Sequence, residues 1–484
     1  MCFKTRAIRS SAVLIATMIL LIGSSARPQD QSTDLRGIYV YSSDVSKIST
    51  GYANAVTASL GVRGTDGIVL VIGWSAIEPS MGQYQWSTLD QWMTKAISMH
   101  KKVDLTVVGG VDTPSWLFQP APDGAGASPL GFTVSPHGGQ TGQCDSETVA
   151  APWDTAFLNQ WDALLAALAK HLKRVGSYTA VTLLRLTGIN RTTDELRLPA
   201  ETPQSTGLAC VSDAVTIWQQ AGYRPSLLLQ GWDSITNSFQ KSFPDKSFSV
   251  AIIPQNAFPR IAEDGSIIQG PVPDLNAPLL QLAEQKFPGR LVVQFNFLMP
   301  GEPASPEVIQ SAQNLGTLAA FQTNNYFGST GQGAACSEPV TNPTPCTTAT
   351  YLELLETGIY PLGQSDQLRA QYIEVFPANV IAFPDDVQQA HIELDPDTLT
   401  LEVAREKAGG KLTVYVTSTD SSAVLNITAT SAAAGQPPIT LGAMAKTDPN
   451  GNEFFIVAKH LPSIASVEIT STSGGALNAQ VKRH

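Results

Sequence analysis

Short runs of β-branched and apolar residues alternate with longer amphipathic stretches along most of the chain. Runs of this length, bounded by Gly, Pro, Asn or Asp, are typical of buried strands, and the stretches between them have the apolar spacing of helices. The pattern predicts eight strands, at Arg36–Tyr41, Gly67–Trp74, Lys102–Gly109, Ala180–Gly188, Ser247–Pro254, Arg290–Leu298, Gly316–Asn324 and Gln371–Phe376. It predicts helices between them at Thr88–His100, Ala156–Val175, Val211–Ala221, Ala277–Lys286, Pro306–Asn314 and Thr347–Tyr360.

Strands that alternate with helices favour an α/β fold with a parallel sheet. Eight such units fit a (β/α)8 TIM barrel with long insertions, which we expect to span residues 33–390. The alternative is an open doubly wound sheet, which usually shows a Gly-rich phosphate turn after its first strand. The sequence has no such turn there.

After Asp386 the pattern changes to short strands separated by Gly, Ser, Asp and Pro, with no helical spacing between them. These strands are predicted at Thr398–Val403, Lys411–Thr417, Ala423–Thr430, Glu453–Lys459 and Ser466–Thr470. We therefore expect a small all-β, immunoglobulin-like sandwich over residues 393–484. Such a domain either binds carbohydrate or covers a hydrophobic flank of the barrel. The second interpretation is favoured because Tyr415, Phe454 and Phe455 are isolated and fit a core.

The first 26 residues have the organisation of a secretory signal peptide. Lys4, Arg6 and Arg9 precede an apolar stretch from Ala12 to Gly23, and small residues follow as a cleavage site. We expect residues 1–26 to be removed and the protein to be secreted or periplasmic. An uncleaved membrane anchor is the alternative, but the apolar stretch is shorter than the roughly 20 residues that span a bilayer.

Composition and charge narrow the possible partners. The 484 residues are 43% apolar and 15% charged, so the chain can bury a large core or form more than one domain. The net charge is −11 and becomes −14 when the three basic residues of the signal are removed. Such acidity argues against nucleic acid or an anionic membrane as a partner.

Cysteine usage agrees with export. Of five cysteines, Cys2 lies in the predicted signal, and four remain: Cys144, Cys210, Cys336 and Cys346. An even number in an exported chain favours two disulfides over a metal site. The preferred pairs are Cys336 with Cys346, inside one Gly/Pro/Thr-rich loop, and Cys144 with Cys210. Zinc is the alternative, but no CxxC or paired-His spacing supports it, so we expect no metal.

Two neighbouring units of the predicted barrel resemble the clan A glycoside hydrolases, notably the family 42 β-galactosidases. The first reads Gly73-Trp74-Ser75-Ala76-Ile77-Glu78-Pro79, then Gly82-Gln83-Tyr84-Gln85-Trp86 and Leu89-Asp90. The second runs from Lys102 to Gly110 and into Thr113-Pro114-Ser115-Trp116-Leu117, similar to the turn after that clan's third strand. The resemblance implies two catalytic carboxylates, an acid/base after strand four and a nucleophile at the end of strand seven.

Glu195 is the acid/base candidate. Glycoside cleavage needs one protonated carboxyl to assist the leaving oxygen and one ionised carboxylate near the anomeric carbon. The resembling family places Asn directly before its catalytic Glu, whereas here Asn190 is followed by Arg191. Glu195 reaches the site if the intervening residues form a loop over the barrel mouth. The alternative is a solvated loop carboxylate, or one that starts a helix beside Asp194.

Glu374 is the candidate for the second carboxylate, because predicted strand seven lacks one. In strand eight, alternation puts Tyr372, Glu374 and Phe376 on one face and the two aliphatic residues between them on the other. A carboxylate flanked by aromatic residues belongs at a barrel mouth, as nucleophile or general base. The alternative is a structural ion pair with an interior arginine such as Arg185.

Other residues near predicted strand ends are candidates for substrate contact. Trp74 and Trp116 could stack on a sugar ring or simply pack. Glu78 is expected to tie the turn to a basic residue, and His137 is expected at the surface. Polar side chains that could bind hydroxyl groups, each with a structural alternative, are Asn190, Gln294, Asn296, Gln322, Asn324 and Tyr372.

The leading hypothesis is an exported glycoside hydrolase that cleaves a β-linked oligo- or polysaccharide and uses no cofactor. The sequence has no Gly-x-Ser-x-Gly elbow, His-Glu-x-x-His motif or phosphate loop that would favour other chemistry. The alternative is a non-catalytic carbohydrate-binding or cell-surface protein on a degenerate glycosidase barrel. The interrupted Asn-Glu pair and the carboxylate-free seventh strand motivate that second hypothesis.

Overall fold

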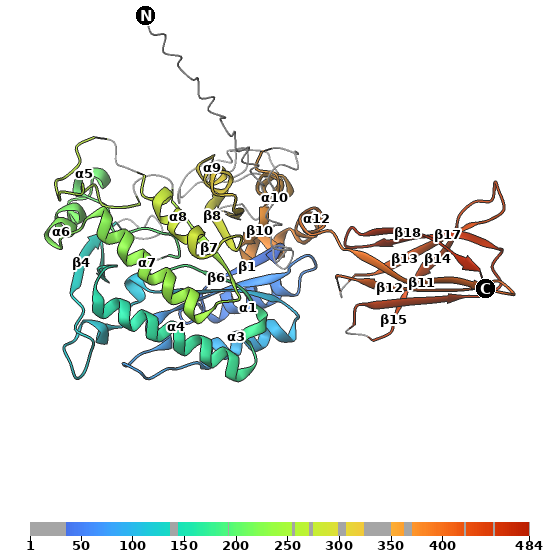
Figure 1. Cartoon of the computed structure of the whole chain (residues 1–484), viewed down its shortest axis with the longest axis horizontal. Coiled ribbons are helices and arrows are strands. Elements are labelled where there is room, and N and C mark those ends of the chain that lie inside the picture. Colours follow the sequence, from blue (N-terminus) through green and yellow to red (C-terminus); the bar gives the residue numbers. More distant parts are fainter. Residues whose placement is uncertain are drawn as a thin grey trace, which may run out of the picture.

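The computed structural model describes residues 35–135, 144–191, 193–253, 257–270, 274–298, 306–323, 350–362, 370–420, 423–448 and 451–483. Eight parallel strands close into a barrel in the order β1-β10-β9-β8-β7-β6-β3-β2 (Figure 1). They are β1 (Gly37–Asp44), β2 (Gly67–Gly73), β3 (Lys102–Val108), β6 (Val181–Arg185), β7 (Ser247–Ala251), β8 (Leu291–Leu298), β9 (Leu318–Thr323) and β10 (Ala370–Val375). Each corresponds to a predicted strand, so the predicted TIM barrel and its strand count are confirmed.

Helices follow the barrel strands and cover the outside of the sheet (Figure 1). The longer ones in the connections are α1 (Thr50–Leu60), α3 (Ser87–Ser98), α4 (Thr155–Val175), α7 (Pro225–Ser242), α8 (Asn276–Lys286), α9 (Pro306–Leu315) and α10 (Tyr351–Ile359). Short helices α2 (Trp74–Ile77), α5 (Pro203–Thr206) and α6 (Ala214–Gln220) lie in the loops, and α11 (Pro377–Ala382) and α12 (Pro384–Leu394) follow the last strand.

Among the longer helices between the barrel strands, α1 and α7 were not predicted, and neither were α11 and α12 after the last strand. The predicted helix at Val211–Ala221 is the short α6, and the true crossover from β6 to β7 is α7. Its central Gly231 lowers the helical signal. That glycine is needed for packing, because a Cβ there would lie 2.3 Å from the carbonyl oxygen of Pro152. Close contact with the neighbouring segment therefore outweighs helix propensity at this position.

Strand alternation sorts the barrel residues into two shells. On β10, Ile373 and Val375 belong to the apolar core between the strands and the helices, as predicted. Tyr372 belongs to a separate cluster inside the barrel, and Glu374 on the same face is fully buried. The interior therefore combines apolar side chains, such as Val69 and Val292, with polar and charged ones from several strands, while the surrounding layer is apolar.

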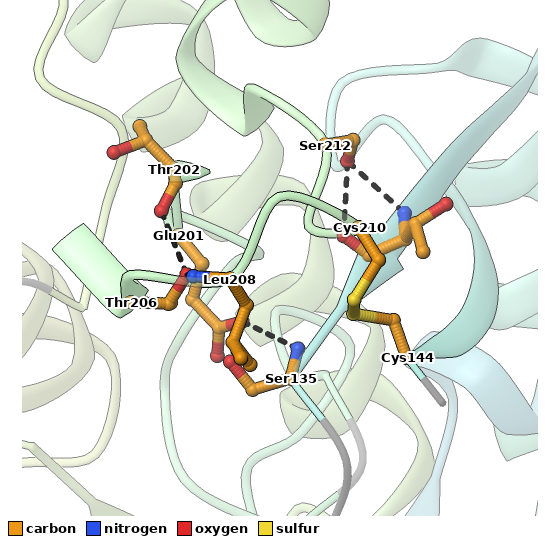
Figure 2. Close-up of a disulfide and its surroundings, with 9 residues drawn as sticks. Ser135, Cys144, Glu201, Thr202, Thr206, Leu208, Cys210 and Ser212 are labelled. Atoms are coloured by element: carbon orange, nitrogen blue, oxygen red, sulfur yellow. Dashed lines mark hydrogen bonds between the residues drawn. A yellow bond between two sulfur atoms is a disulfide. The ribbon is translucent and has the colours of Figure 1, made fainter. Parts of the chain in front are cut away.

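An antiparallel hairpin, β4 (Pro129–Val134) and β5 (Asp145–Ala150), is inserted between β3 and α4. A disulfide joins Cys144 beside this hairpin to Cys210, with their Cα atoms 6.0 Å apart (Figure 2). This confirms one predicted pair. Cys336 and Cys346 lie outside the described residues. Near the disulfide, the backbone N–H of Ser135 donates to Glu201 Oε2 at 2.9 Å (Figure 2), so the loop that follows β6 is fastened to the hairpin.

The carboxyl-terminal part is all β, as expected. One sheet has the order β15-β16-β12-β11-β19 and the other β14-β13-β17-β18. The strands are β11 (Leu399–Lys407), β12 (Lys411–Ser418), β13 (Leu425–Ser431), β14 (Ile439–Ala443), β15 (Ala445–Lys446), β16 (Glu453–Ala458), β17 (Ile464–Ser471), β18 (Ala476–Gln480) and β19 (Lys482–Arg483). With β11 to β18 labelled A, B, C, C′, D, E, F and G, the sheets read DEBA and C′CFG, which is the immunoglobulin arrangement with an added C′ strand; β19 pairs in parallel with β11 at the edge of the first sheet.

One core fills the space between these sheets, with residues such as Val414 from one and Ile427 from the other. Phe454 is 1% exposed and belongs to it, as predicted. The same prediction was wrong for Tyr415 and Phe455. Their rings stack at 5.9 Å and are only partly buried, because alternation along β12 and β16 turns them to the outer face.

The sandwich contacts the barrel at the amino-terminal ends of its strands. Arg63, in the loop before β2, donates to the hydroxyl of Thr472, and Gln388 on α12 donates to the backbone carbonyl of Thr472 at 3.4 Å. In barrels of this kind the active site lies at the opposite, carboxyl-terminal end of the strands. The domain therefore covers a flank of the barrel, and its known contacts are remote from the site described below.

The disulfide gives the first prediction. Cross-linking residues separated by 66 positions restricts the unfolded chain, which corresponds to a stabilisation of about 4 kcal/mol in the chain-entropy model. We expect the double substitution Cys144→Ser and Cys210→Ser to lower the free energy of unfolding by about 2–4 kcal/mol, measured with guanidinium. The barrel core should still form. An unchanged unfolding midpoint in the double variant would contradict a stabilising role for the cross-link.

Candidate active site

Arg185, at the end of β6, is the centre of the barrel interior. Its guanidinium is fully buried and pairs with three carboxylates from different segments. Nη2 lies 3.2 Å from Asp104 Oδ2 on β3 and also donates to Glu374 on β10, while Nη1 donates to Asp194 in the loop after β6. Nε donates to the hydroxyl of Ser249 on β7 at 2.8 Å. One side chain thus ties four elements together.

The charges in this cluster do not balance if every group is ionised, since one cation faces three carboxylates. The pKa of Glu374 is raised to about 8, mainly by burial; the charge of Arg185 and the amide of Gln322 oppose this rise, and Asp104 and Asp194 add to it. Burial likewise raises the pKa of Asp104. Isolated buried charges are costly, so shared protons reduce the net charge of the cluster.

Both oxygens of Glu374 are occupied. Oε1 accepts from Arg185, and Oε2 accepts from Nε2 of Gln322 on β9 at 2.7 Å. Glu374 is 0% exposed. The ion pair with Arg185 is the alternative stated for this residue from the sequence, and Gln322, predicted to contact substrate, is hydrogen-bonded to Glu374 instead.

Glu195 is held differently. Its Oε1 accepts from Nδ2 of Asn296 on β8 at 3.0 Å, whereas Oε2 is buried and accepts no hydrogen bond of normal geometry from the described residues. The side chain is 5% exposed. Burial raises the pKa of Glu195, and the neighbouring Asp194 raises it further. A raised pKa with one oxygen unoccupied suits a proton donor.

The backbone on both sides of Glu195 is fixed by the neighbouring loops. Leu196 N–H donates to the carbonyl of Ala251 at the end of β7 at 2.8 Å. Earlier in the loop, Val111 N–H donates to the carbonyl of Arg191 at 3.0 Å. Gly110 permits this approach, because its φ is +54° and a Cβ there would lie 2.1 Å from the Arg191 carbonyl oxygen.

Arg191, which interrupts the expected Asn-Glu pair, points to the inserted hairpin. Its Nε lies 2.7 Å from Glu147 on β5, and its Nη1 lies 2.8 Å from Glu201. Glu201 is the residue that also binds Ser135 beside the disulfide. The loop that carries Glu195 is therefore fixed by the hairpin on one side and by β7 on the other.

Tyr41, on β1, connects the two candidate carboxylates. Its ring is partly exposed and lies 5.5 Å from that of Phe376. Burial raises the pKa of the Tyr41 hydroxyl well above its ordinary value, and Asp194, Glu195 and Glu374 raise it further. The pairing of Arg185 with Glu374 and with Asp194, directly before Glu195, places both candidate carboxylates in one region of the barrel.

Trp74 and Trp116 pack in the core. Trp74 is 0% and Trp116 4% exposed, and their rings meet edge to face at 6.0 Å. The indole N–H of Trp74 donates to Glu78 Oε2, and that of Trp116 to the Glu78 carbonyl. Their burial contradicts the predicted sugar-stacking faces. Glu78 ties the turn as predicted, but its partners are Trp74 and the N–H of Gly82 rather than a basic residue.

The remaining residues predicted to contact substrate lie in different places. Tyr372 donates its hydroxyl to Gln294 Oε1 at 2.5 Å, so it joins the interior cluster with Glu374 and Gln322. Asn190 is 2% exposed and its Oδ1 accepts from Gly188 N–H at 3.1 Å, inside the loop. Asn324 and His137 lie outside the described residues.

Sequence reasoning did not select Asp104, Ser249 or Tyr41. Asp104 stands in the run Lys-Val-Asp-Leu-Thr-Val-Val, where a carboxylate interrupts a buried strand. Like Glu374, Asp104 is a carboxylate in an otherwise largely apolar strand, so the same signal could have found it. Ser249 and Tyr41 carried no comparable signal, because hydroxyl groups are common in strands.

A second charged group lies at the carboxyl-terminal ends of the strands. Lys47 pairs with Asp44 at the end of β1, at 3.2 Å, and with Asp112 after β3. Burial raises the pKa of Asp112 and Lys47 lowers it.

Among the residues that the structure describes, no three His, Cys, Asp or Glu side chains are arranged to hold a metal ion. No described helix is long and apolar enough to cross a membrane.

Residues 66–174 match the glycoside hydrolase family 42 model, described as β-galactosidase. The match covers β2, α3, β3 and α4 and confirms the resemblance predicted from these units. It ends before Glu195 and Glu374. Comparison with curated proteins finds no match. Together with the barrel, the family match supports a glycoside hydrolase.

Several solved structures that align with this chain are glycosidases. The catalytic domain of β-amylase from Paenibacillus polymyxa has 14% identity and a TM-score of 0.47, over 73% of this chain and 98% of that one. A xylanase from Thermoanaerobacterium saccharolyticum has 10% identity and a TM-score of 0.39, over 71% and 86%. A β-galactosidase from the psychrophilic Marinomonas ef1 has 11% identity and a TM-score of 0.39, over 70% and 54%.

Removing the central cation tests the electrostatic description. Arg185→Met leaves buried carboxylates without their partner, and we expect a loss of about 3–5 kcal/mol in the free energy of unfolding at about pH 8. Burial raises the folded-state pKa of Asp104 and of Glu374, so protonation stabilises the fold below their ordinary values, and this stabilisation is lost as pH rises through the folded-state pKa. The deficit should therefore be smaller at about pH 5.

The measurement is urea unfolding of wild type and variant at both pH values. Arg405→Met, an exposed arginine on β11 of the sandwich, is the matched control and should change stability little. An equal loss at both pH values would show that the cost of Arg185→Met comes from packing rather than from charge.

Proposed function

We propose that the protein is an exported glycoside hydrolase that cleaves a β-linked oligo- or polysaccharide, with Glu195 as the proton donor and Glu374 as the second carboxylate. One observation carries this proposal. Two buried carboxylates from different parts of the chain, after β6 and on β10, are held by one guanidinium, because Arg185 pairs with Glu374 and with Asp194 directly before Glu195. A pair of carboxylates is what glycoside cleavage requires.

The two carboxylates differ in the way that such a reaction requires. Glu195 has a raised pKa and one oxygen without a well-aligned donor, as suits the acid that protonates the leaving oxygen. Burial raises the pKa of Glu374, and the donors of Arg185 and Gln322, which orient its two oxygens, oppose that rise and favour the ionised form. We assign it the role of nucleophile or general base.

Linkage and location rest on separate arguments. The β-linkage is supported by the description of the matching family model as a β-galactosidase. Export is supported by the disulfide between Cys144 and Cys210, since disulfides persist in oxidising compartments, and by the signal-like first 26 residues.

A second candidate function, carbohydrate binding without hydrolysis, is favoured by one observation. Glu374 is 0% exposed and both of its oxygens are already bound, as in a purely structural ion pair. In that case Glu195 and its loop would contact a saccharide that is never cleaved.

The test is hydrolysis of a panel of aryl β-glycosides and plant polysaccharides. We expect Glu195→Gln to lower kcat by about 10²–10⁴-fold on substrates with poor leaving groups, because the leaving oxygen loses its proton donor. Dinitrophenyl glycosides, whose leaving group needs no proton, should be affected far less. Glu374→Gln should lower kcat on both substrate types, since the second carboxylate acts whatever the leaving group.

Glu468→Gln, an exposed carboxylate on β17, is the matched control and should leave kcat unchanged. Saccharide binding, measured by calorimetry on the same variants, separates the two functions. Binding with no hydrolysis by the wild type favours the second candidate. Hydrolysis that neither glutamate substitution lowers rejects the assignment of both residues.

A further inference from the structure

A continuous chain of hydrogen bonds runs from Arg185 to Glu195 through the barrel. Arg185 Nε donates to Ser249 Oγ at 2.8 Å, and the Ser249 hydroxyl is hydrogen-bonded to that of Tyr372. Tyr372 donates to Gln294 Oε1 at 2.5 Å, and Gln294 Nε2 donates to Asn296 Oδ1 at 2.7 Å. Asn296 Nδ2 then donates to Glu195 Oε1 at 3.0 Å. The members come from β6, β7, β10 and β8.

The direction of this chain is fixed by the chemistry of its first member. A guanidinium has only donors, so the Ser249 oxygen must accept from Arg185 and its proton is free to bond onward. Tyr372 then receives a hydrogen bond and gives its own proton to Gln294 Oε1. A primary amide that accepts through oxygen donates through nitrogen, so the same direction passes along Gln294 and Asn296 to Glu195.

The orientation of the two amides seen in the structure is favoured by the same reasoning. If both amides were reversed, the Gln294 nitrogen would face the Tyr372 oxygen, and the Tyr372 proton would turn to Ser249 Oγ, which also accepts from Arg185. The Ser249 proton would then lack an acceptor among the contacts of the described residues, and an unpaired donor in a buried site is costly. The charge of Arg185 therefore favours the orientation in which Asn296 donates to Glu195.

At the end of the chain the two oxygens of Glu195 become different. With Asn296 in this orientation, Oε1 faces an N–H donor and accepts from it, so the proton of a neutral Glu195 is placed on Oε2. Oε2 is the oxygen that has no well-aligned donor among the described residues. We propose that Ser249, Tyr372, Gln294 and Asn296 are positioning residues that make Oε2 the proton-donating oxygen of Glu195.

This inference rests on the proposed function, and it gives Arg185 a role at both carboxylates. Through Nη1 the guanidinium holds Asp194, directly before Glu195. Through Nη2 it holds Glu374, and through Nε it starts the chain to Asn296. Loop position, the second carboxylate and the orientation of the acid are therefore set by one side chain, for which no contact with either carboxyl oxygen of Glu195 is seen among the described residues.

Several charged and titratable groups surround Glu195, and each has a known sign. Asp194 on the same loop raises its pKa, while the Thr193 hydroxyl and the Asn296 amide lower it. Arg197, further along the loop, and Tyr41 on β1 also interact with its charge. Arg185 and Glu374 lie across the interior and act on the same Tyr41. Of these influences on the pKa of Glu195, the chain of hydrogen bonds sets the one that comes from Asn296.

The test breaks the chain without changing a charge. Gln294→Met removes the amide N–H that donates to Asn296 Oδ1. The Asn296 side chain is then free to rotate and place its oxygen toward Glu195. The protonated carboxyl would then donate from Oε1 to Asn296, so the pKa of Glu195 rises and the proton is held away from Oε2. Tyr372→Phe removes the preceding link and should act in the same direction with less change in side-chain volume.

Two readouts are combined. The pKa of Glu195 is measured by NMR titration of protein labelled with ¹³C at the glutamate carboxyl carbon, with the signal assigned from Glu195→Gln. Activity is compared on alkyl and dinitrophenyl β-glycosides. We expect a raised pKa and about a tenfold loss of kcat on alkyl glycosides, with little loss on dinitrophenyl glycosides. Tyr223→Phe, a buried tyrosine outside the chain, is the matched control.

The outcomes are distinct. An unchanged pKa of Glu195 in both variants, or an equal loss of kcat on both substrates, would overturn the positioning role and leave only a structural one. If Gln294→Met does not fold, Tyr372→Phe decides by the same criteria. If the wild type hydrolyses no glycoside, the proposed function fails, yet the titration still reports whether the chain controls the protonation of Glu195.

Discussion

The buried guanidinium of Arg185 is the interaction on which the interior of this barrel depends. A charge removed from water is stable only when partners with good geometry surround it. Here Asp104, Asp194, Glu374 and the hydroxyl of Ser249 provide those partners, and they come from β3, β7, β10 and the loop after β6. The requirement to satisfy one cation therefore fixes the relative position of segments far apart in the sequence.

A polar interior also explains why the apolar layer lies outside the strands. In β10 the aliphatic residues Ile373 and Val375 face the helices, while Tyr372 and Glu374 face inward. Packing between sheet and helices supplies the hydrophobic stabilisation, which leaves the interior free to hold a hydrogen-bonded network. Since buried networks of this kind are stable only when nearly every group is satisfied, an atom without a well-aligned partner beside the candidate site, such as Oε2 of Glu195, is a place where function is to be sought.

The sequence predicted the fold well and the site in part, for one physical reason. Strand alternation is a local property, so all eight barrel strands and the inward face of Glu374 could be found from the order of residues alone. Partnership across the barrel is not local. Arg185 was recognised only as one possible partner of Glu374, and sugar stacking and plain packing both stayed open for Trp74 because nothing in its neighbourhood showed that Trp116 and Trp161 would enclose it.

The departure from the expected Asn-Glu pair has a structural explanation in the inserted hairpin. Arg191 occupies the position after Asn190, and its side chain turns outward to Glu147 on β5 and to Glu201, in the segment joined to the hairpin by the disulfide. The carboxylate that enters the interior is then Glu195, because the pairing of Leu196 with the end of β7 brings that part of the loop back against the barrel. The hairpin inserted after β3 and the position of Glu195, five residues after Asn190 rather than directly after it, therefore depend on each other. Neither could be predicted from the sequence of its own loop.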